Sequence, residues 1–161
     1  EYTSLDQPEN ALPRLQQAYQ RMQPADPFAP NVVVDLIYAA MSLKQFDAAR
    51  EAIAQSEARL AGYPDFHLAR GLFYMNLIRS DTAKNSAELP KVEQSFQRCL
   101  ALGETDRYKS VRGAGSFLAS YNLGLYYHVF GNAALARQCF ESAANAGYEP
   151  ARAILGKLPA A

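Results

Sequence analysis

The chain has 161 residues, 49% of them apolar and 20% charged, which is the composition of one ordinary globular domain and excludes a disordered chain. Sixteen Lys and Arg residues balance sixteen Asp and Glu residues, and surfaces that bind nucleic acid usually have a basic excess, so we expect no nucleic-acid partner. No run of about 18 apolar residues is present, so we expect no membrane insertion.

Apolar residues recur at helical spacing almost throughout the chain, and Gly, Pro and Asn separate the segments. The one short candidate strand, 31–35, continues into an apolar run that suits a buried helix better, with Pro30 in its first turn. We therefore expect an all-α fold. In chain order the predicted helices cover about 8–22, 30–43, 47–61, 65–78, 89–101, 112–130, 133–146 and, as a short last helix, 150–158.

The helices from the second to the seventh form three pairs that share one register. Equivalent positions are Ile37, Gly71 and Gly124 on the first helices, Ala49, Val92 and Ala136 on the second helices, and Ile53, Phe96 and Phe140 four residues later. Small residues such as Gly124 and Ala136 let two helix backbones approach closely. We expect Phe140 to fill the remaining space toward the next layer.

The third pair, with Gly124, Gly131, Ala136 and Phe140, resembles the tetratricopeptide repeat, a helix hairpin of about 34 residues. The resemblance implies a single domain, 1–161, in which hairpins stack into an α-solenoid of about three repeats with capping helices. Its predicted parts are a cap helix at 8–22, repeats at about 30–63, 64–103 with a long inner turn, and 112–148, and a terminal helix at 150–158. A generic helical bundle with accidental small residues is the alternative.

No residue pattern predicts a catalytic, cofactor-binding or metal site. Cys99 and Cys139 are on helix faces that should be packed, so we interpret them as buried apolar residues. His67 and His128 occupy different positions in the repeat register. No acidic residue or cysteine is spaced to join His128 at a metal, although His128 could contact a binding partner.

The linker before the sixth helix contains a small basic cluster, Arg107, Lys109 and Arg112. Three basic side chains in a loop could hold a phosphate or an acidic partner, but we expect them to be solvated. The segment 113–116 that follows is too short for a phosphate fingerprint and has no P-loop lysine. An enzyme with a site around His128 and Tyr121 is the least favoured interpretation.

Stacked hairpins line a concave surface with their first helices, and this surface is the predicted partner-binding face. Its residues, called here the first-helix face, are Tyr38, Met41, Leu72, Met75, Tyr121, Asn122, Leu125 and His128, together with Val34 and Leu68. Such an apolar and aromatic surface suits a helix or an extended segment of a protein or peptide. Alternatively, some of these side chains pack on the extra segments of the chain.

Five segments resemble the C-terminal repeat region of bacterial family 2 glycosyltransferases that have tetratricopeptide repeats: 62–71, 96–104, 108–117, 121–124 and 147–151. The resemblance implies a module, detached from its enzyme, that mediates self-association or acceptor docking. Those enzymes bind the nucleotide sugar with a separate α/β domain, so no catalytic residue and no cofactor can be assigned here. The longer segment at 79–90 departs from the family.

That departure leaves a second interpretation open, a free-standing tetratricopeptide scaffold for an envelope, secretion or other complex. The first residues lack the positive and apolar regions of a signal peptide, which favours a cytoplasmic location. The sequence does not begin with Met, and we interpret it as a fragment or a processed product.

Overall fold

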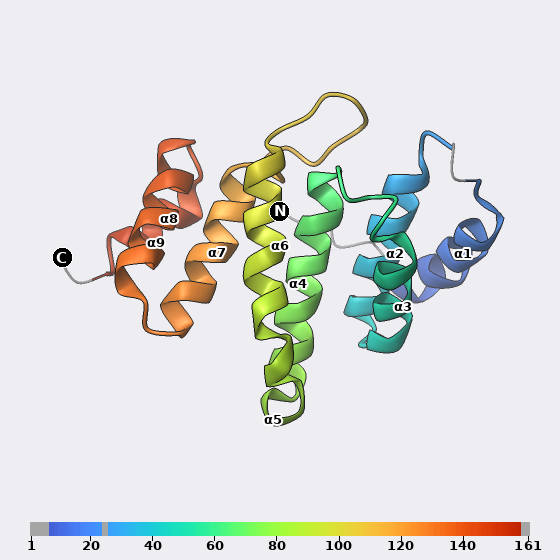
Figure 1. Ribbon diagram of the computed structural model, residues 1–161, viewed down its shortest axis with the longest axis horizontal. Helices are drawn as coiled ribbons and strands as arrows, with labels where there is room; N and C mark the ends of the chain where they lie inside the picture. The colour runs from blue at the N-terminus through green and yellow to red at the C-terminus, as the bar shows by residue number, and fades with distance from the viewer. Residues whose placement is uncertain (1–6, 24–25, 159–161) are drawn as a thin grey trace.

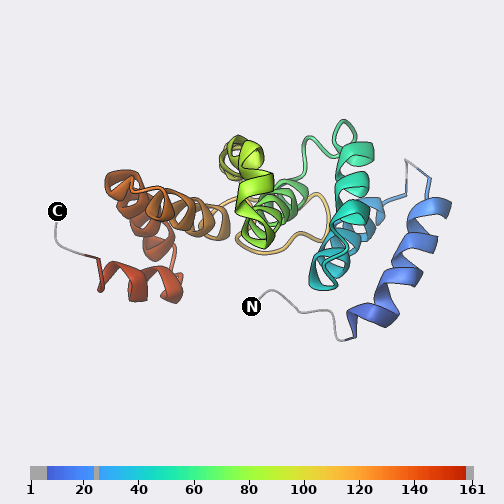
Figure 2. The same ribbon diagram turned by 90° about the horizontal axis from the view of Figure 1, so that it is seen from below.

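All secondary structure in the part of the chain that the computed structural model describes, residues 7–23 and 26–158, is helical, so the predicted all-α class is confirmed there. The helices are α1 (Pro8–Arg21), α2 (Ala29–Ser42), α3 (Phe46–Ser56), α4 (Pro64–Ser80), α5 (Thr82–Asn85), the 3₁₀ turn η1 (Ser86–Glu88), α6 (Leu89–Leu102), α7 (Phe117–Val129), α8 (Ala133–Asn145) and α9 (Glu149–Leu155). They follow one another in chain order along the long axis of the molecule, as two perpendicular views show (Figure 1, Figure 2).

The helices pack in sequential pairs. α2 packs on α3, α4 on α6, and α7 on α8, while contacts of α2 with α4 and of α6 with α7 join neighbouring pairs. At the two ends of the row, α1 packs on α2 and α9 packs on α8. Buried apolar side chains form one large core from α1 to α7 and a smaller one around Phe140 in α8 and α9.

Two pairs have the same close contact between a glycine and a phenylalanine. A Cβ atom added to Gly71 would lie 2.6 Å from the ring of Phe96, and one added to Gly124 would lie 2.7 Å from the ring of Phe140. Both rings are fully buried. The matching contacts agree with the predicted equivalence of Gly71 with Gly124 and of Phe96 with Phe140, but the predicted direction of Phe140 was wrong, because its ring covers Gly124 within the α7–α8 pair.

Three helix ends differ from the prediction. α3 ends at Ser56 rather than near 61. The residues after Ser56 form a turn that buries Leu60 and leads to the start of α4 at Pro64. α4 extends to Ser80, and the expected long inner turn is largely helical, as α5 and η1. Asp81 stabilises that turn by accepting a hydrogen bond from the backbone N–H of Lys84 at 3.1 Å.

The sixth predicted helix was placed too early, since α7 begins at Phe117 rather than near 112. Gly113 has a φ of +94°, which is not a helical angle, and Gly115 lies against the backbone of Gly103. A Cβ at Gly115 would lie 1.9 Å from the Gly103 carbonyl oxygen, so only glycine fits. The two ends of the segment 103–116 therefore meet, as in an Ω-loop, and we call this segment the linker loop.

Two carboxylates hold the linker loop. Glu104 accepts hydrogen bonds at its base from the backbone N–H groups of Gly113 and Gly115, at 3.2 and 3.1 Å, and from the hydroxyl of Ser116 at 2.7 Å. The buried Asp65 of α4 accepts three further hydrogen bonds from the loop. The donors are the Tyr108 hydroxyl at 2.5 Å, the Ser110 hydroxyl at 2.7 Å and the Val111 N–H at 2.6 Å. The loop consequently arches over the start of α4 (Figure 1).

Candidate interaction surface

The residues of the predicted first-helix face that come from α2 and α4 are only partly accessible. Tyr38, Met41, Leu72 and Met75 are half-buried and pack against the large core. Val34 and Leu68 are buried completely or nearly so and belong to that core. These side chains therefore support the helix packing and expose only part of their surface to a partner.

The residues from α7 lie beside the smaller core. Tyr121 and Leu125 are half-buried against it, and Tyr121 also contacts the ring of Tyr148 edge-on at 5.1 Å. Asn122 is buried and donates a hydrogen bond to the Leu118 carbonyl at 2.8 Å, as a helix-supporting side chain does. His128 is exposed near the end of α7. The two groups thus pack on different cores.

The second histidine, His67, belongs to a buried junction between the α3–α4 turn and α6. Its Nε2 lies 3.0 Å from the carbonyl oxygen of Ala61, which also accepts hydrogen bonds from Nε and Nη2 of Arg98 at 3.4 and 3.2 Å. A carbonyl can only accept, so Nε2 of His67 has the proton. Burial lowers the pKa of His67, and the nearby Arg70 and Arg98 act in the same direction. This histidine is a neutral structural group.

The interpretation of the cysteines as buried apolar residues is confirmed for Cys99 and only partly for Cys139. Cys99 is fully buried and its Sγ lies 3.4 Å from the Pro64 carbonyl, whereas Cys139 is half-buried. Burial raises the pKa of both thiols, well above the usual range for Cys99. Both thiols are therefore protonated at neutral pH, which makes them poor nucleophiles.

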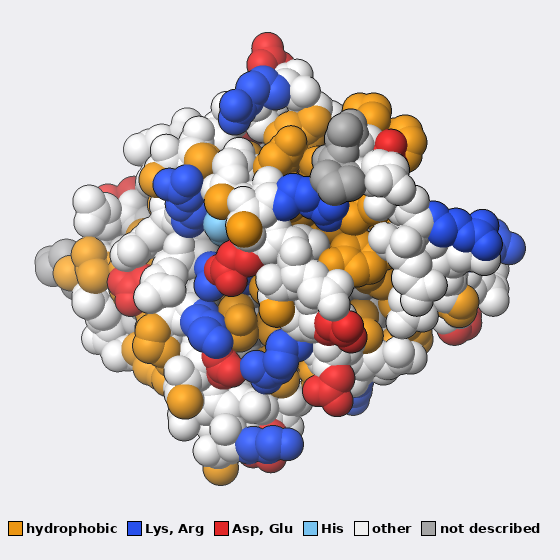
Figure 3. All heavy atoms as spheres, turned by 45° about the vertical axis from the view of Figure 1, so that its right-hand side comes forward, with side chains coloured by type: hydrophobic (Ala, Val, Ile, Leu, Met, Phe, Trp, Pro, Cys, Tyr) orange, Lys and Arg blue, Asp and Glu red, His pale blue; other side chains and the backbone are white. Residues whose placement is uncertain are grey.

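The three basic residues of the linker loop, Arg107, Lys109 and Arg112, are exposed, as expected of solvated side chains. Basic and acidic side chains alternate across the side of the molecule shown in Figure 3, with hydrophobic side chains visible between them. That side therefore presents no broad field of one charge sign, the kind that would attract a polyanion.

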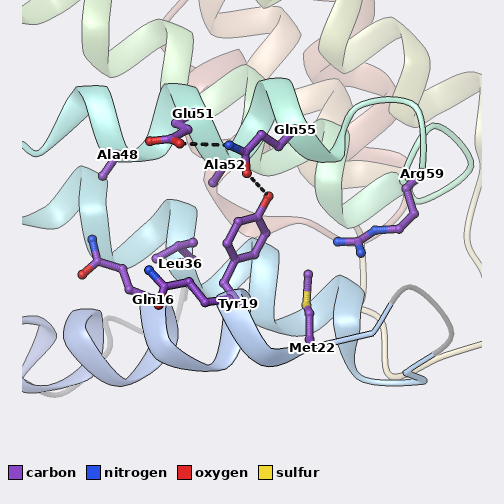
Figure 4. Close-up of a pocket in the computed structure, with 10 residues that line it drawn as sticks. Gln16, Tyr19, Met22, Leu36, Ala48, Glu51, Ala52, Gln55 and Arg59 are labelled. Atoms are coloured by element: carbon purple, nitrogen blue, oxygen red, sulfur yellow. Dashed lines mark hydrogen bonds between the residues drawn. The ribbon is translucent and has the colours of Figure 1, made fainter.

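The prediction missed a groove of about 780 Å³ between α1 and α3. We call it the α1–α3 groove (Figure 4). The residues that line it are Gln16, Tyr19, Gln20, Met22, Leu36, Ala48, Glu51, Ala52, Gln55 and Arg59. The closely spaced glutamines of α1 were the available signal in the sequence. The sequence predicted α1 only as a cap helix, so these glutamines were given no role.

Comparison with known proteins gives no relative: no protein-family model, curated protein or solved structure matches the chain. Within residues 7–23 and 26–158, no three His, Cys, Asp or Glu side chains are grouped so that they could hold a metal ion. No helix in that part of the chain has both the length and the apolar character required to cross a membrane.

Proposed function

We propose that the chain is a non-catalytic protein-interaction or oligomerisation module, built as a tetratricopeptide-like array with α1 and α9 as its caps. The observation that supports it is the repeated contact of a helix glycine with a fully buried phenylalanine, Gly71 with Phe96 and Gly124 with Phe140. Paired helices that bury little apolar surface alone gain a core by stacking, and such rows offer long surfaces to partners.

In this proposal the first-helix face binds a protein or peptide, or a second copy of the chain. The half-buried apolar side chains of α2, α4 and α7 support it, because each keeps part of its surface available next to a fixed core. The parent would be a bacterial family 2 glycosyltransferase, as the sequence resemblance implies. The cytoplasmic location stays a prediction.

One observation favours the second candidate, a free-standing scaffold for an envelope, secretion or other complex. The segment 79–90, in which the sequence departs from the glycosyltransferase family, folds as ordered structure with Asn85 buried. Its Nδ2 donates to the carbonyl of Leu77 at 3.0 Å, so the segment is part of the α4–α6 pair. The gene sequence upstream of the first residue distinguishes a glycosyltransferase parent from a free-standing scaffold.

The test compares two double variants of the whole chain. Leu72→Gln with Leu125→Gln changes the first-helix face, while Gln94→Ala with Gln138→Ala changes exposed positions on α6 and α8. We expect a partner identified by affinity capture and mass spectrometry, or self-association measured by sedimentation, to be lost only in the first variant. Thermal unfolding verifies that both variants fold.

A second measurement addresses catalysis. Calorimetry with UDP-glucose and UDP-N-acetylglucosamine should give no heat of binding to the chain. Binding accompanied by turnover of either nucleotide sugar would show that the non-catalytic assignment is wrong.

A further inference from the structure

The α1–α3 groove has the size and the wall chemistry of a binding site. Its volume of about 780 Å³ lies within the range of about 300–1,000 Å³ that is typical of ligand sites. Leu36, from α2, and Ala52 are buried and form an apolar floor. α1 and α3 form the two walls (Figure 4).

The walls present side-chain amides. Gln55 of α3 accepts a hydrogen bond from the hydroxyl of Tyr19 at 2.9 Å and donates one to Glu51 at 2.9 Å, so it is held in place. Gln16 and Gln20 of α1 line the same groove and have no hydrogen-bond partner among the described residues. An amide both donates and accepts, as a peptide unit does, so these side chains match the main chain of an extended peptide.

Arg59 adds a positive charge that forms no ion pair with the described residues. Its side chain extends from the α3–α4 turn into the groove (Figure 4), and its Nε is buried without a hydrogen-bond partner. Arg50 and Arg70 differ in that each forms an ion pair, Arg50 with Glu88 at 2.8 Å and Arg70 with Glu57 at 3.1 Å, although the Nε of Arg70 is likewise buried without a hydrogen-bond partner. A buried donor left without an acceptor is unfavourable, and a carboxylate is the acceptor that a guanidinium binds best.

The dimensions suit a short segment. On a helix that rises 1.5 Å per residue, α3 covers about 10 Å from Ala48 to Gln55, which is the length of about three residues of extended chain. We propose that the α1–α3 groove binds an extended acidic segment of a partner protein, with its main chain along the glutamines and an Asp or Glu side chain on Arg59. This site is separate from the first-helix face and goes beyond the proposed function.

The probe is a phage-displayed library of random ten-residue peptides, selected on the immobilised whole chain. Enriched peptides are synthesised with a fluorescent label, and dissociation constants are measured by anisotropy. We expect the enriched peptides to share one Asp or Glu. Its replacement by Asn or Gln, or Arg59→Gln in the protein, should each weaken binding about tenfold or more, and both together hardly further.

Two further variants complete the design. Ala48→Gln places a larger side chain in the groove and should also weaken binding, whereas Arg14→Gln, which removes an exposed charge of α1 outside the groove, should not. Because Arg59 has no hydrogen-bond or ion-pair partner in residues 7–23 and 26–158, Arg59→Gln should keep the thermal unfolding midpoint of the parent chain.

The proposal is wrong if selection enriches no peptide, if the enriched peptides share no acidic residue, or if Arg59→Gln and Ala48→Gln bind them as tightly as the parent chain. Peptides that lose affinity with Leu72→Gln and Leu125→Gln, but not with Arg59→Gln, would support the first-helix face and contradict this groove. Binding that depends on Arg59 and is insensitive to those two substitutions supports the groove alone.

Discussion

The contact of Gly124 with Phe140 allows a quantitative test, in which the same methyl group is destabilising in one background and stabilising in another. In the parent chain, Gly124→Ala places a Cβ 2.7 Å from the Phe140 ring, and such overpacking costs about 1–3 kcal/mol. Replacing a helix-interior glycine by alanine returns about 1 kcal/mol. The net loss of unfolding free energy should therefore be about 0–2 kcal/mol.

Phe140→Ala removes the obstacle. Because the ring is fully buried, this substitution alone should reduce the free energy of unfolding by about 3–5 kcal/mol. In that background Gly124→Ala no longer meets the ring, so it keeps the gain of about 1 kcal/mol in helix propensity and adds a methyl group where a cavity had opened. The second substitution should thus be stabilising by about 1–2 kcal/mol.

Urea unfolding followed by circular dichroism measures all four proteins of this cycle. We expect a coupling free energy of about 1–4 kcal/mol between the two sites, and the same sign from Gly71 and Phe96. Effects that add within about 0.5 kcal/mol would show that the ring does not cover the glycine, and the shared register of the two pairs would then be wrong.

Three other predictions concern the linker loop and the buried histidine. Asp65→Ala leaves three donors of the loop without their acceptor, so it should reduce the unfolding free energy by about 2–4 kcal/mol. Hydrogen exchange at the Val111 amide should become faster, and unchanged exchange there would contradict the role of Asp65. Gly115→Ala should lower the free energy of unfolding, measured by urea titration, by about 3 kcal/mol, because the Gly103 backbone occupies the space of the added Cβ. The control Gly62→Ala has open space around it and should be neutral or stabilising, and equal effects of the two substitutions would refute the close approach of Gly115 to Gly103. The pKa of His67 is lowered in the folded chain, so the unfolded chain binds more protons and the free energy of unfolding should fall as the pH drops below about 6.5. His67→Gln should reduce the change in urea midpoint between pH 7.5 and pH 5.5, and an unchanged pH dependence would exclude His67 as the cause of that change.

The sequence was sufficient for the features that depend on local pattern. Helix positions followed from apolar spacing and from Gly and Pro between the segments, and most predicted ends lie within a few residues of those observed. The equivalence of Gly71 with Gly124 and of Phe96 with Phe140 followed from the shared register, because one packing geometry demands the same sizes at equivalent positions. That inference needed no knowledge of distant contacts.

Features that depend on distant contacts could not be predicted. Asp65 and the donors Tyr108 and Ser110 are more than 40 residues apart in the sequence, so nothing local marked them as partners. The same holds for Arg59, because its lack of an ion-pair partner in the described part of the chain becomes visible only when its neighbours in space are known. The late start of α7 belongs here too, since it results from the backbone contact between Gly115 and Gly103.

The linker loop has a consequence for how the molecule unfolds. A row of helix pairs that touch only their neighbours can lose one end while the rest remains folded. Here the loop that precedes α7 is bound to α4 through Asp65 and to α2 through Asn31, whose Nδ2 donates to the Lys109 carbonyl at 2.9 Å. Opening of the α2–α3 pair therefore also breaks its contact with the linker loop. This favours melting of α2 and α3 together with α4 and the loop over separate fraying of the α2–α3 pair.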